Sequence, residues 1–335
     1  MSTLNLYDEL DDLDLDEKGR LRHPTRNSKK LPASEQVFLR KQDDSRANFA
    51  FTYQAARFEA GWLLDSLGGF YEHQWISDVL RRVKGGKEAS VYLCRAGAQI
   101  PADLIAAKVY RPRMLRNLRN DHAYREGRDN LDEEGKIVLD DGQQHAMAKR
   151  TEYGKALLHQ SWIAYEFTAM QALHAAGADV PQPYEMAHNA ILMSFIGDLD
   201  GCAPALSEIS LSRPEARTLF ERVVYNLEVL LAQERIHGDL SAYNILYWEE
   251  AITLIDFPQV VSPKINRNAY AIFQRDVTRV CEYFTKQGLT LNPRKLAADL
   301  WQKHGYRPGP EIHPSLLNAD DERDRALWQK QKNAR

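Results

Sequence analysis

One segment of the chain constrains the fold more than any other: residues 237–244, which read HGDLSAYN, followed by IDF at residues 255–257. Asp239 and Asn244 stand five residues apart, and Asp256 comes twelve residues after Asn244 between apolar residues. A carboxylate at the end of a buried strand needs a partner, and Mg²⁺ prefers hard oxygen ligands of this kind. The spacing therefore predicts a polar turn and a strand end that meet at one metal-binding place.

The interval from Asp239 to Asn244 equals that of the kinase loop H-R-D-x-x-x-x-N. Phosphoryl transfer requires a cover over the phosphates, a lysine, oxygen ligands for a metal and an aspartate beside the attacking oxygen. We expect Asp239 to act as the base or orienting residue, and Asn244 and Asp256 to bind the metal. Taken singly, these residues would sooner stabilise a loop or cap a turn. Their combination, with His237 and Leu240 in place, favours phosphoryl transfer.

Lys108 is a cation in the run 105–110, which otherwise has the composition of a buried strand. A buried lysine is costly unless it is paired. Glu166, on a helix with an apolar face predicted around residues 162–173, is the natural partner, and the pair would hold the α- and β-phosphates of a nucleotide. The alternatives are an edge-strand lysine that discourages aggregation and a solvated helix glutamate.

Residues 83–92, which read VKGGKEASVY, join two predicted strands. Glycines in such a turn let the backbone approach a phosphate. The turn is neither G-x-G-x-x-G nor a P-loop, because Lys87 is followed by Glu88. Without the residues downstream, it would be interpreted as an ordinary Gly-Gly hairpin.

The order of the predicted elements favours an α+β fold with two lobes, a β-rich first lobe and a reduced, mainly helical second lobe, with a ligand cleft between them. Strands are expected around residues 75–83, 89–94, 104–110, 191–195, 245–247 and 253–255. Helices are expected at residues 53–67, closed by Gly68-Gly69, at 162–173, after the capping box that Ser212 and Glu215 form, and around 273–284.

We expect three regions along the chain. Residues 1–50 form a disordered charged tail, acidic from Asp8 to Glu17 and basic from Lys18 to Lys30, which is a solubilising extension or a docking arm. Residues 51–290 form the main domain, with the first lobe ending at about residue 196 and an exposed insertion loop at about 117–150. Residues 291–335 form a C-terminal extension.

Composition narrows the classes of partner. The formal net charge of −3 gives no global attraction to nucleic acid. The three cysteines are far apart and suggest neither a disulfide framework nor a zinc site. No apolar run approaches the length of a membrane helix, and the N-terminus is acidic where a signal peptide would be basic, so we expect a cytoplasmic protein without a membrane partner.

From about residue 83 to residue 284 the chain resembles the RIO-type atypical serine/threonine protein kinases, in a prokaryote-like form. The resemblance rests on GKEASVY at 86–92, AKVY at 107–110, LMSFIG at 192–197, the loop 237–244 and RDV at 275–277. It implies ATP between the lobes, with adenine against the backbone of Ser194 and Ile196, Gly86, Lys87 and Ser90 over the phosphates, and Lys108 and Glu166 beside them. Asp239 is the implied catalytic aspartate.

The same resemblance implies Mg²⁺, with Mn²⁺ as a substitute, on Asn244 and Asp256. It further implies that Asp256 can itself accept phosphate, that the protein phosphorylates its own serines, and that it serves small ribosomal subunit maturation. Autophosphorylation would make this a phosphoprotein that acts as a kinase, an ATPase or both.

Two alternatives stay open. The pattern HGDLxxxN with IDF also occurs in small-molecule kinases of the aminoglycoside and choline type. A nucleotide-binding scaffold without turnover is the other alternative. It would bind RNA or a ribosomal particle through residues 18–30 and through Arg111, Arg113, Arg116 and Arg119.

Overall fold

The computed structural model describes residues 51–335 except residues 87, 112–127, 307–317, 319 and 334–335. The expected charged tail lies outside the described residues, as do Lys87, Arg113, Arg116 and Arg119. The expected boundaries of the three regions therefore stay a prediction.

Five antiparallel strands form the sheet of the first lobe, in the order β1-β2-β3-β5-β4. Their bounds are Ile76–Gly85 for β1, Ala89–Ala96 for β2, Leu104–Tyr110 for β3, Pro183–Ala187 for β4 and Ala190–Ser194 for β5. The strands expected around residues 75–83, 89–94 and 104–110 are confirmed as β1, β2 and β3. β4 was not expected, because Pro183 reads as a breaker; at the edge of a sheet a proline is tolerated.

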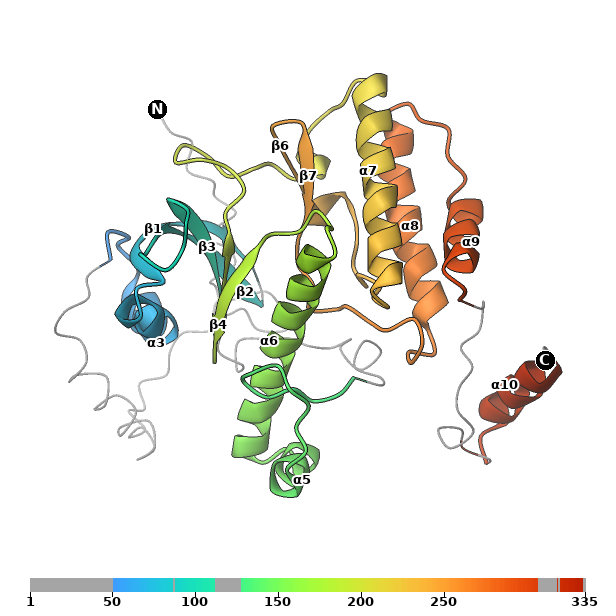
Figure 1. Ribbon diagram of the computed structural model, residues 1–335, viewed down its shortest axis with the longest axis horizontal. Helices are drawn as coiled ribbons and strands as arrows, with labels where there is room; N and C mark the ends of the chain where they lie inside the picture. Colours follow the sequence, from blue (N-terminus) through green and yellow to red (C-terminus); the bar gives the residue numbers. More distant parts are fainter. Residues whose placement is uncertain (1–50, 87, 112–127, 307–317, 319, 334–335) are drawn as a thin grey trace, which may run out of the picture. The chain divides into compact units, whose positions relative to one another are not determined.

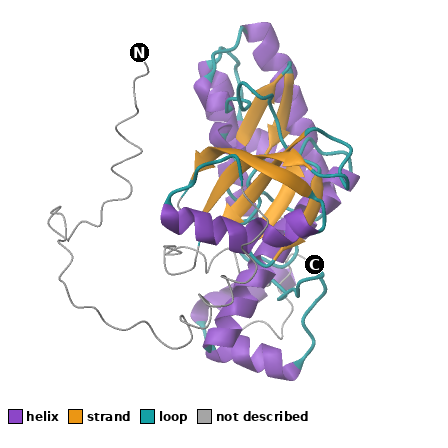
Figure 2. Cartoon of the chain, turned by 90° about the vertical axis from the view of Figure 1, so that its left-hand side faces the viewer, coloured by secondary structure: helices purple, strands orange, loops and turns teal. Residues whose placement is uncertain are grey.

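Helix α3, Arg57–Glu72, crosses one face of this sheet (Figures 1 and 2). Leu63, Leu67 and Phe70 are buried against the strands, at the spacing of one helix face. The prediction that Gly68-Gly69 ends the helix is wrong, because Phe70 continues the buried face beyond the two glycines. A glycine inside a helix costs about 1 kcal/mol, and such packing offsets that cost.

The described part of the connection from β3 to β4 holds two helices, α5 at Asp141–Lys149 and α6 at Glu152–Ala175. The described part of the expected insertion loop is therefore not all loop. Asp140 caps α5 by accepting a hydrogen bond from the Gln143 N–H at 2.7 Å, and Met147 is the buried residue of that helix. Because Met147 is the one residue of α5 that is buried, the sequence of this helix has no apolar periodicity from which it could have been predicted. α6 is the helix expected around residues 162–173, with an earlier start, and it packs beside β4 and β5 (Figure 1).

The second lobe is mainly helical. The predicted capping box is confirmed: Ser212 and Glu215 cap helix α7, Arg213–Ala232. The hairpin β6–β7, at Ile245–Trp248 and Ala251–Leu254, connects the loop at residues 237–244 to Asp256. Helix α8, Ala269–Lys286, packs beside α7 around a shared core (Figure 1). The remaining elements among the described residues are the short 3₁₀ turns η2, Leu206–Glu208, and η3, Ala242–Asn244, and the helices α9, Pro293–Lys303, and α10, Glu322–Asn333.

The α+β class expected from the sequence is confirmed by these two lobes. Within the described part of the chain, no helix has the length and apolar character that a membrane crossing requires.

Candidate active site

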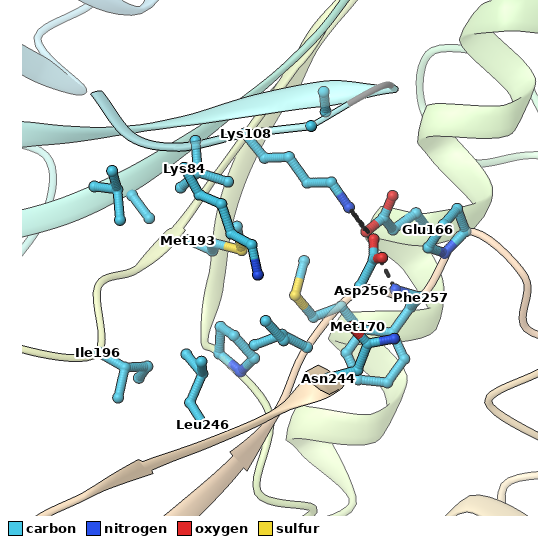
Figure 3. Close-up of a pocket in the computed structure, with 18 of the residues that line it drawn as sticks. Lys84, Lys108, Glu166, Met170, Met193, Ile196, Asn244, Leu246, Asp256 and Phe257 are labelled. Carbon is cyan, nitrogen blue, oxygen red and sulfur yellow. Dashed lines mark hydrogen bonds and ion pairs between the residues drawn. The ribbon is translucent and has the colours of Figure 1, made fainter. Parts of the chain in front are cut away.

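An ion-pair network around the buried Lys108 joins three elements that are far apart in the sequence (Figure 3). Lys108 Nζ, from β3, lies 2.6 Å from Glu166 Oε1 on α6 and 2.7 Å from Asp256 Oδ1 after β7. The Tyr110 hydroxyl donates to Glu166 Oε2 at 2.6 Å, and the Phe257 N–H donates to Glu166 Oε1 at 3.3 Å. The expected pairing of Lys108 with Glu166 is present, and Asp256 joins it.

This network sets the charge states of its members. Burial acts to raise the pKa of the Asp256 carboxyl, but the Lys108 ammonium, aided by His237 and Lys84, outweighs it and holds that pKa below its ordinary value. Burial acts to lower the pKa of Lys108, and the carboxylates of Asp256 and Glu166 together raise it. Lys108 and Asp256 are therefore both charged at neutral pH.

The backbone at Asp256 is also unusual. Its φ of +73° lies in the left-handed region, which costs a non-glycine residue about 1–3 kcal/mol and persists only where surrounding contacts offset that cost. Arg128 holds the segment that follows: it donates to the Pro258 carbonyl at 2.9 Å and to the Val260 carbonyl, and its guanidinium lies 4.3 Å from the Tyr165 ring centroid. Sequence reasoning missed Arg128, because nothing in its local pattern signals a contact 130 residues away.

Helix α8 fixes the loop that carries Asp239. The buried Asp276 carboxylate accepts the Gly238 N–H at 2.8 Å, and Arg275 donates to the Gly238 carbonyl. Burial raises the pKa of Asp276, against the charges of His237 and Arg275. Gly238 has a φ of +84°, and a Cβ there would lie 2.1 Å from the Gln259 carbonyl oxygen, so a larger residue does not fit.

The loop also holds itself in place. The His237 Nε2–H donates to the Ile255 carbonyl at 3.0 Å, which ties the loop to the strand end before Asp256. The Asn244 side-chain NH₂ donates to the Asp239 carbonyl at 2.9 Å. The side chain of Asp239 itself pairs with Arg279 of α8, with 2.7 Å between Oδ1 and the guanidinium.

A hollow of about 590 Å³ brings these groups together. Lys108, Glu166, Asp239, Asn244 and Asp256 all line it. Its other walls are largely apolar and come from both lobes, including Val91, Ala106, Met170, Met193 and Leu246 (Figure 3). Apolar walls with a few convergent polar groups are typical of a small-ligand site.

The residues expected over the phosphates divide into two groups. Gly86 lines the hollow, and a Cβ there would lie 2.8 Å from the Ala89 carbonyl oxygen, so the turn needs glycine. The side chain of Ser90 does not line the hollow, which corrects the expectation. Side chains alternate between the two faces of a strand, and the side chains of Ala89 and Val91 in β2 face the hollow. Ser90, between them, is therefore buried on the opposite face of the strand.

Ser194 and Ile196, expected to contact adenine, both line the hollow. The Ser194 N–H donates to the Gln182 carbonyl at 2.8 Å, and the Ile196 carbonyl accepts the Ala203 N–H at 2.9 Å. Among the described residues, none accepts the Ile196 N–H. Because Ile196 lines the hollow, its N–H can serve as a donor to a ligand there.

Lys84, at the end of β1, is a residue that sequence reasoning passed over. It lines the hollow, and its amino group reaches into it on the side of Met193 (Figure 3). The sequence signal was weak, since Lys84 is one of two lysines in a short Gly-rich turn.

The side-chain oxygen atoms of Asn244 and Asp256, which both line the hollow, fit a hard divalent cation. The side-chain nitrogen of Asn244 donates to the loop backbone, which leaves Asn244 Oδ1 as the atom that could bind a metal. In Asp256, Lys108 contacts Oδ1, and Oδ2 has no hydrogen-bond partner among the described residues. No group of three or more His, Cys, Asp or Glu that could hold a metal occurs in the described ranges. One carboxylate and one amide suit Mg²⁺, which is usually bound together with substrate phosphates.

Comparison with known proteins gives concordant results. A family model described as the RIO domain matches residues 103–296. The RIO-type serine/threonine-protein kinase Rio1 of Haloferax volcanii is 28% identical over 206 residues, which cover 62% of this chain and 63% of that protein. Rio1 of Thermoplasma acidophilum is 29% identical over 135 residues, which cover 40% of this chain and 69% of that protein.

Among solved structures, the Rio2 kinase–ADP/Mg²⁺–phosphoaspartate complex of Chaetomium thermophilum superimposes with a TM-score of 0.53 at 18% identity. The superposition covers 90% of this chain and 86% of that chain, which confirms a kinase-like fold. The matches favour the RIO family over small-molecule kinases. Because the RIO domain model matches more than half of the residues, this chain belongs to the RIO domain family.

Proposed function

We propose that this chain is an ATP- and Mg²⁺-dependent serine/threonine kinase. The observation that carries the proposal is the network of Lys108, Glu166 and Asp256 in the same hollow as Asp239 and Asn244. These are the parts that phosphoryl transfer requires, in one place and in the charge states that it requires. The relatives named as serine/threonine-protein kinases support the same reaction class.

In this proposal ATP lies in the hollow with its adenine between the apolar walls. The Ile196 N–H and the Ser194 backbone read its edge, and Gly86 lets the turn between β1 and β2 approach the phosphates. Lys108 binds the α- and β-phosphates, held in place by Glu166, and Lys84 adds a second positive charge. Asn244 and Asp256 would hold Mg²⁺, which neutralises charge on the phosphates when it is bound.

The transfer step needs one further group from the protein. The acceptor oxygen forms a bond to the γ-phosphorus, and the bond from that phosphorus to the β,γ-bridging oxygen breaks, so that ADP leaves with the electron pair. The acceptor proton passes to the Asp239 carboxylate. Asp239 thus orients the hydroxyl and receives its proton, a role worth about 10²- to 10⁴-fold in rate.

The test is a magnesium-dependent turnover assay with labelled ATP on the wild type and on Lys108→Ala, Asp239→Asn and Asp256→Asn. We expect turnover by the wild type and a loss of at least about 10²-fold in each variant. Equal turnover in all four proteins would contradict the proposal.

Mapping the label by residue in the same assay decides between acceptors. Acid-stable label on serine or threonine indicates kinase activity, including autophosphorylation. Hydroxylamine-labile label at Asp256 indicates an aspartyl phosphate and an ATPase-type cycle. The role in ribosome maturation stays a prediction, tested by salt-dependent cosedimentation of the chain with small ribosomal subunits.

A further inference from the structure

A second hollow, of about 680 Å³, lies next to the nucleotide hollow and shares Asp239 and Asn244 with it. Its walls come from the loop after η2, from η3 and from α8, and they include Ser210, Tyr243, Arg279, Tyr283 and Lys286. In phosphoryl transfer the attacking and leaving oxygens lie roughly in line with the phosphorus. An acceptor must therefore reach Asp239 from a side that the nucleotide does not occupy, and this second hollow provides such an approach.

Arg279, which lines the second hollow, pairs with the side-chain carboxylate of Asp239. Its guanidinium lies 2.7 Å from Asp239 Oδ1, and both side chains are 41% exposed. Oδ2 of Asp239 has no hydrogen-bond partner among the described residues. Arg279 therefore occupies one carboxylate oxygen and leaves the other for an incoming hydroxyl.

Arg279 lies three residues after Asp276 on α8, so both side chains lie on the same side of that helix. Asp276 holds the backbone of the loop at Gly238, and Arg279 holds the side chain of the next residue. The helix thus fixes both the position of the loop and the orientation of its carboxylate. An aspartate side chain that projects from a loop into a partly open hollow would otherwise be free to rotate about its side-chain bonds.

We propose that the second hollow is the entrance for the phosphoryl acceptor and that Arg279 is a positioning residue, which turns Asp239 Oδ2 toward the acceptor hydroxyl. This inference rests on the proposed function. The acceptor oxygen bonds to the γ-phosphorus, ADP departs with the bridging oxygen and its electron pair, and the acceptor proton goes to Asp239 Oδ2. Arg279 takes no part in bond making; it acts through the orientation of Asp239.

The experiment measures kcat and KM for ATP, with dephosphorylated casein as the probe acceptor, in the wild type, Arg279→Ala, Arg279→Lys and Arg222→Ala. Arg222 is the matched control: it forms an exposed pair with Asp179 at 2.5 Å and does not line either hollow. Binding of ADP with Mg²⁺ to each protein is measured in parallel by titration.

We expect Arg279→Ala to lower kcat by about 10- to 100-fold, the effect of a misoriented reacting group, with KM for ATP and ADP affinity within about twofold of the wild type. Arg279→Lys keeps a cation beside Oδ1 and should recover most of kcat. Arg222→Ala should match the wild type.

Three results would overturn the inference. The first is a kcat for Arg279→Ala equal to that of the wild type. The second is a loss of ADP affinity as large as the loss of kcat, because that would indicate a disturbed nucleotide hollow. The third is a wild type that turns over ATP but labels neither casein nor itself. A wild type that neither binds nor turns over ATP would instead refute the proposed function on which the inference depends.

Discussion

The two ion pairs of the site have similar geometry and very different surroundings. Lys108 and Glu166 meet at 2.6 Å with side chains 11% and 3% exposed, whereas Arg279 and Asp239 meet at 2.7 Å with both side chains 41% exposed. A buried charge that loses its partner keeps its desolvation cost, so substitution of one member of the first pair alone strongly destabilises the chain. A pair in contact with water contributes little to stability.

The difference assigns a separate task to each side of the site. On the nucleotide side, charges are fixed by burial and by several partners, which suits groups that must hold a large polyanion in one geometry. On the acceptor side, a single exposed contact orients Asp239 and leaves an oxygen free, which suits a surface that exchanges acceptors.

Asp256→Asn should have the largest effect, a loss of about 10³-fold in magnesium-dependent ATP turnover, because it removes the charge that faces both Lys108 and the metal. Asparagine tolerates the left-handed backbone, so the loop should keep its shape. Steady-state turnover is the measurement. The control is Asp299→Asn, which removes an exposed aspartate paired with Lys295 at 2.6 Å and should leave turnover unchanged. Full activity in Asp256→Asn would contradict the account.

Glu166→Ala should lower the free energy of unfolding by about 3 kcal/mol, because Lys108 and the Tyr110 hydroxyl would both lose a buried partner. Denaturant titration measures the change. Glu228→Ala is the matched control, since Glu228 meets Lys303 at the same 2.6 Å on the surface, where the pair should contribute at most about 1 kcal/mol. Equal losses in the two variants would show that burial does not distinguish the pairs.

The stability of the network should depend on pH in one direction. The pKa of Asp256 is lower in the folded chain than its unfolded value of about 3.9, so its contribution is complete at higher pH and is lost as pH falls through the folded pKa. The pKa of Asp276 is raised, so its effect on the pH dependence of stability has the opposite sign. Because both proteins contain Asp276, its effect cancels when the unfolding free energy of Asp256→Asn is subtracted from that of the wild type. That difference in unfolding free energy should shrink as the pH falls below about 5, where the carboxyl of the unfolded chain begins to protonate; a difference that stays constant would refute the ion pair.

Arg279→Ala should have the smallest effect on stability, below about 1 kcal/mol, because the pair that it removes is exposed. Thermal or denaturant unfolding of this variant beside Glu166→Ala measures the contrast directly. A loss as large as that in Glu166→Ala would make Arg279 a structural residue and remove the separation between the two sides.

Sequence spacing predicted the residues that carry charge in the nucleotide hollow. Asp239, Asn244 and Asp256 sit at fixed intervals within one loop and hairpin, so local pattern was enough to group them. Lys108 and Glu166 were paired by the cost of burying an unpaired lysine, although 58 residues separate them.

Three features could not be predicted, for physical reasons. Contacts such as Arg279 with Asp239 or Arg128 with the Pro258 carbonyl join residues whose own neighbours give no sign of a partner. Ser90 was misplaced because a strand turns alternate residues to opposite faces, and the motif alone does not say which face meets the ligand. Helix α5 was missed because its single buried residue leaves no period to detect.

The assignment of the magnesium–nucleotide site is tested most directly by a calorimetric titration of the wild type and Asp256→Asn with ADP, in the presence and absence of Mg²⁺. The wild type should bind ADP about tenfold more tightly or better with Mg²⁺, through a coupling in which Asp256 takes part, and Asp256→Asn should bind ADP equally with and without it. No binding to the wild type, or an unchanged Mg²⁺ effect in Asp256→Asn, would contradict the assignment of this hollow as a magnesium–nucleotide site.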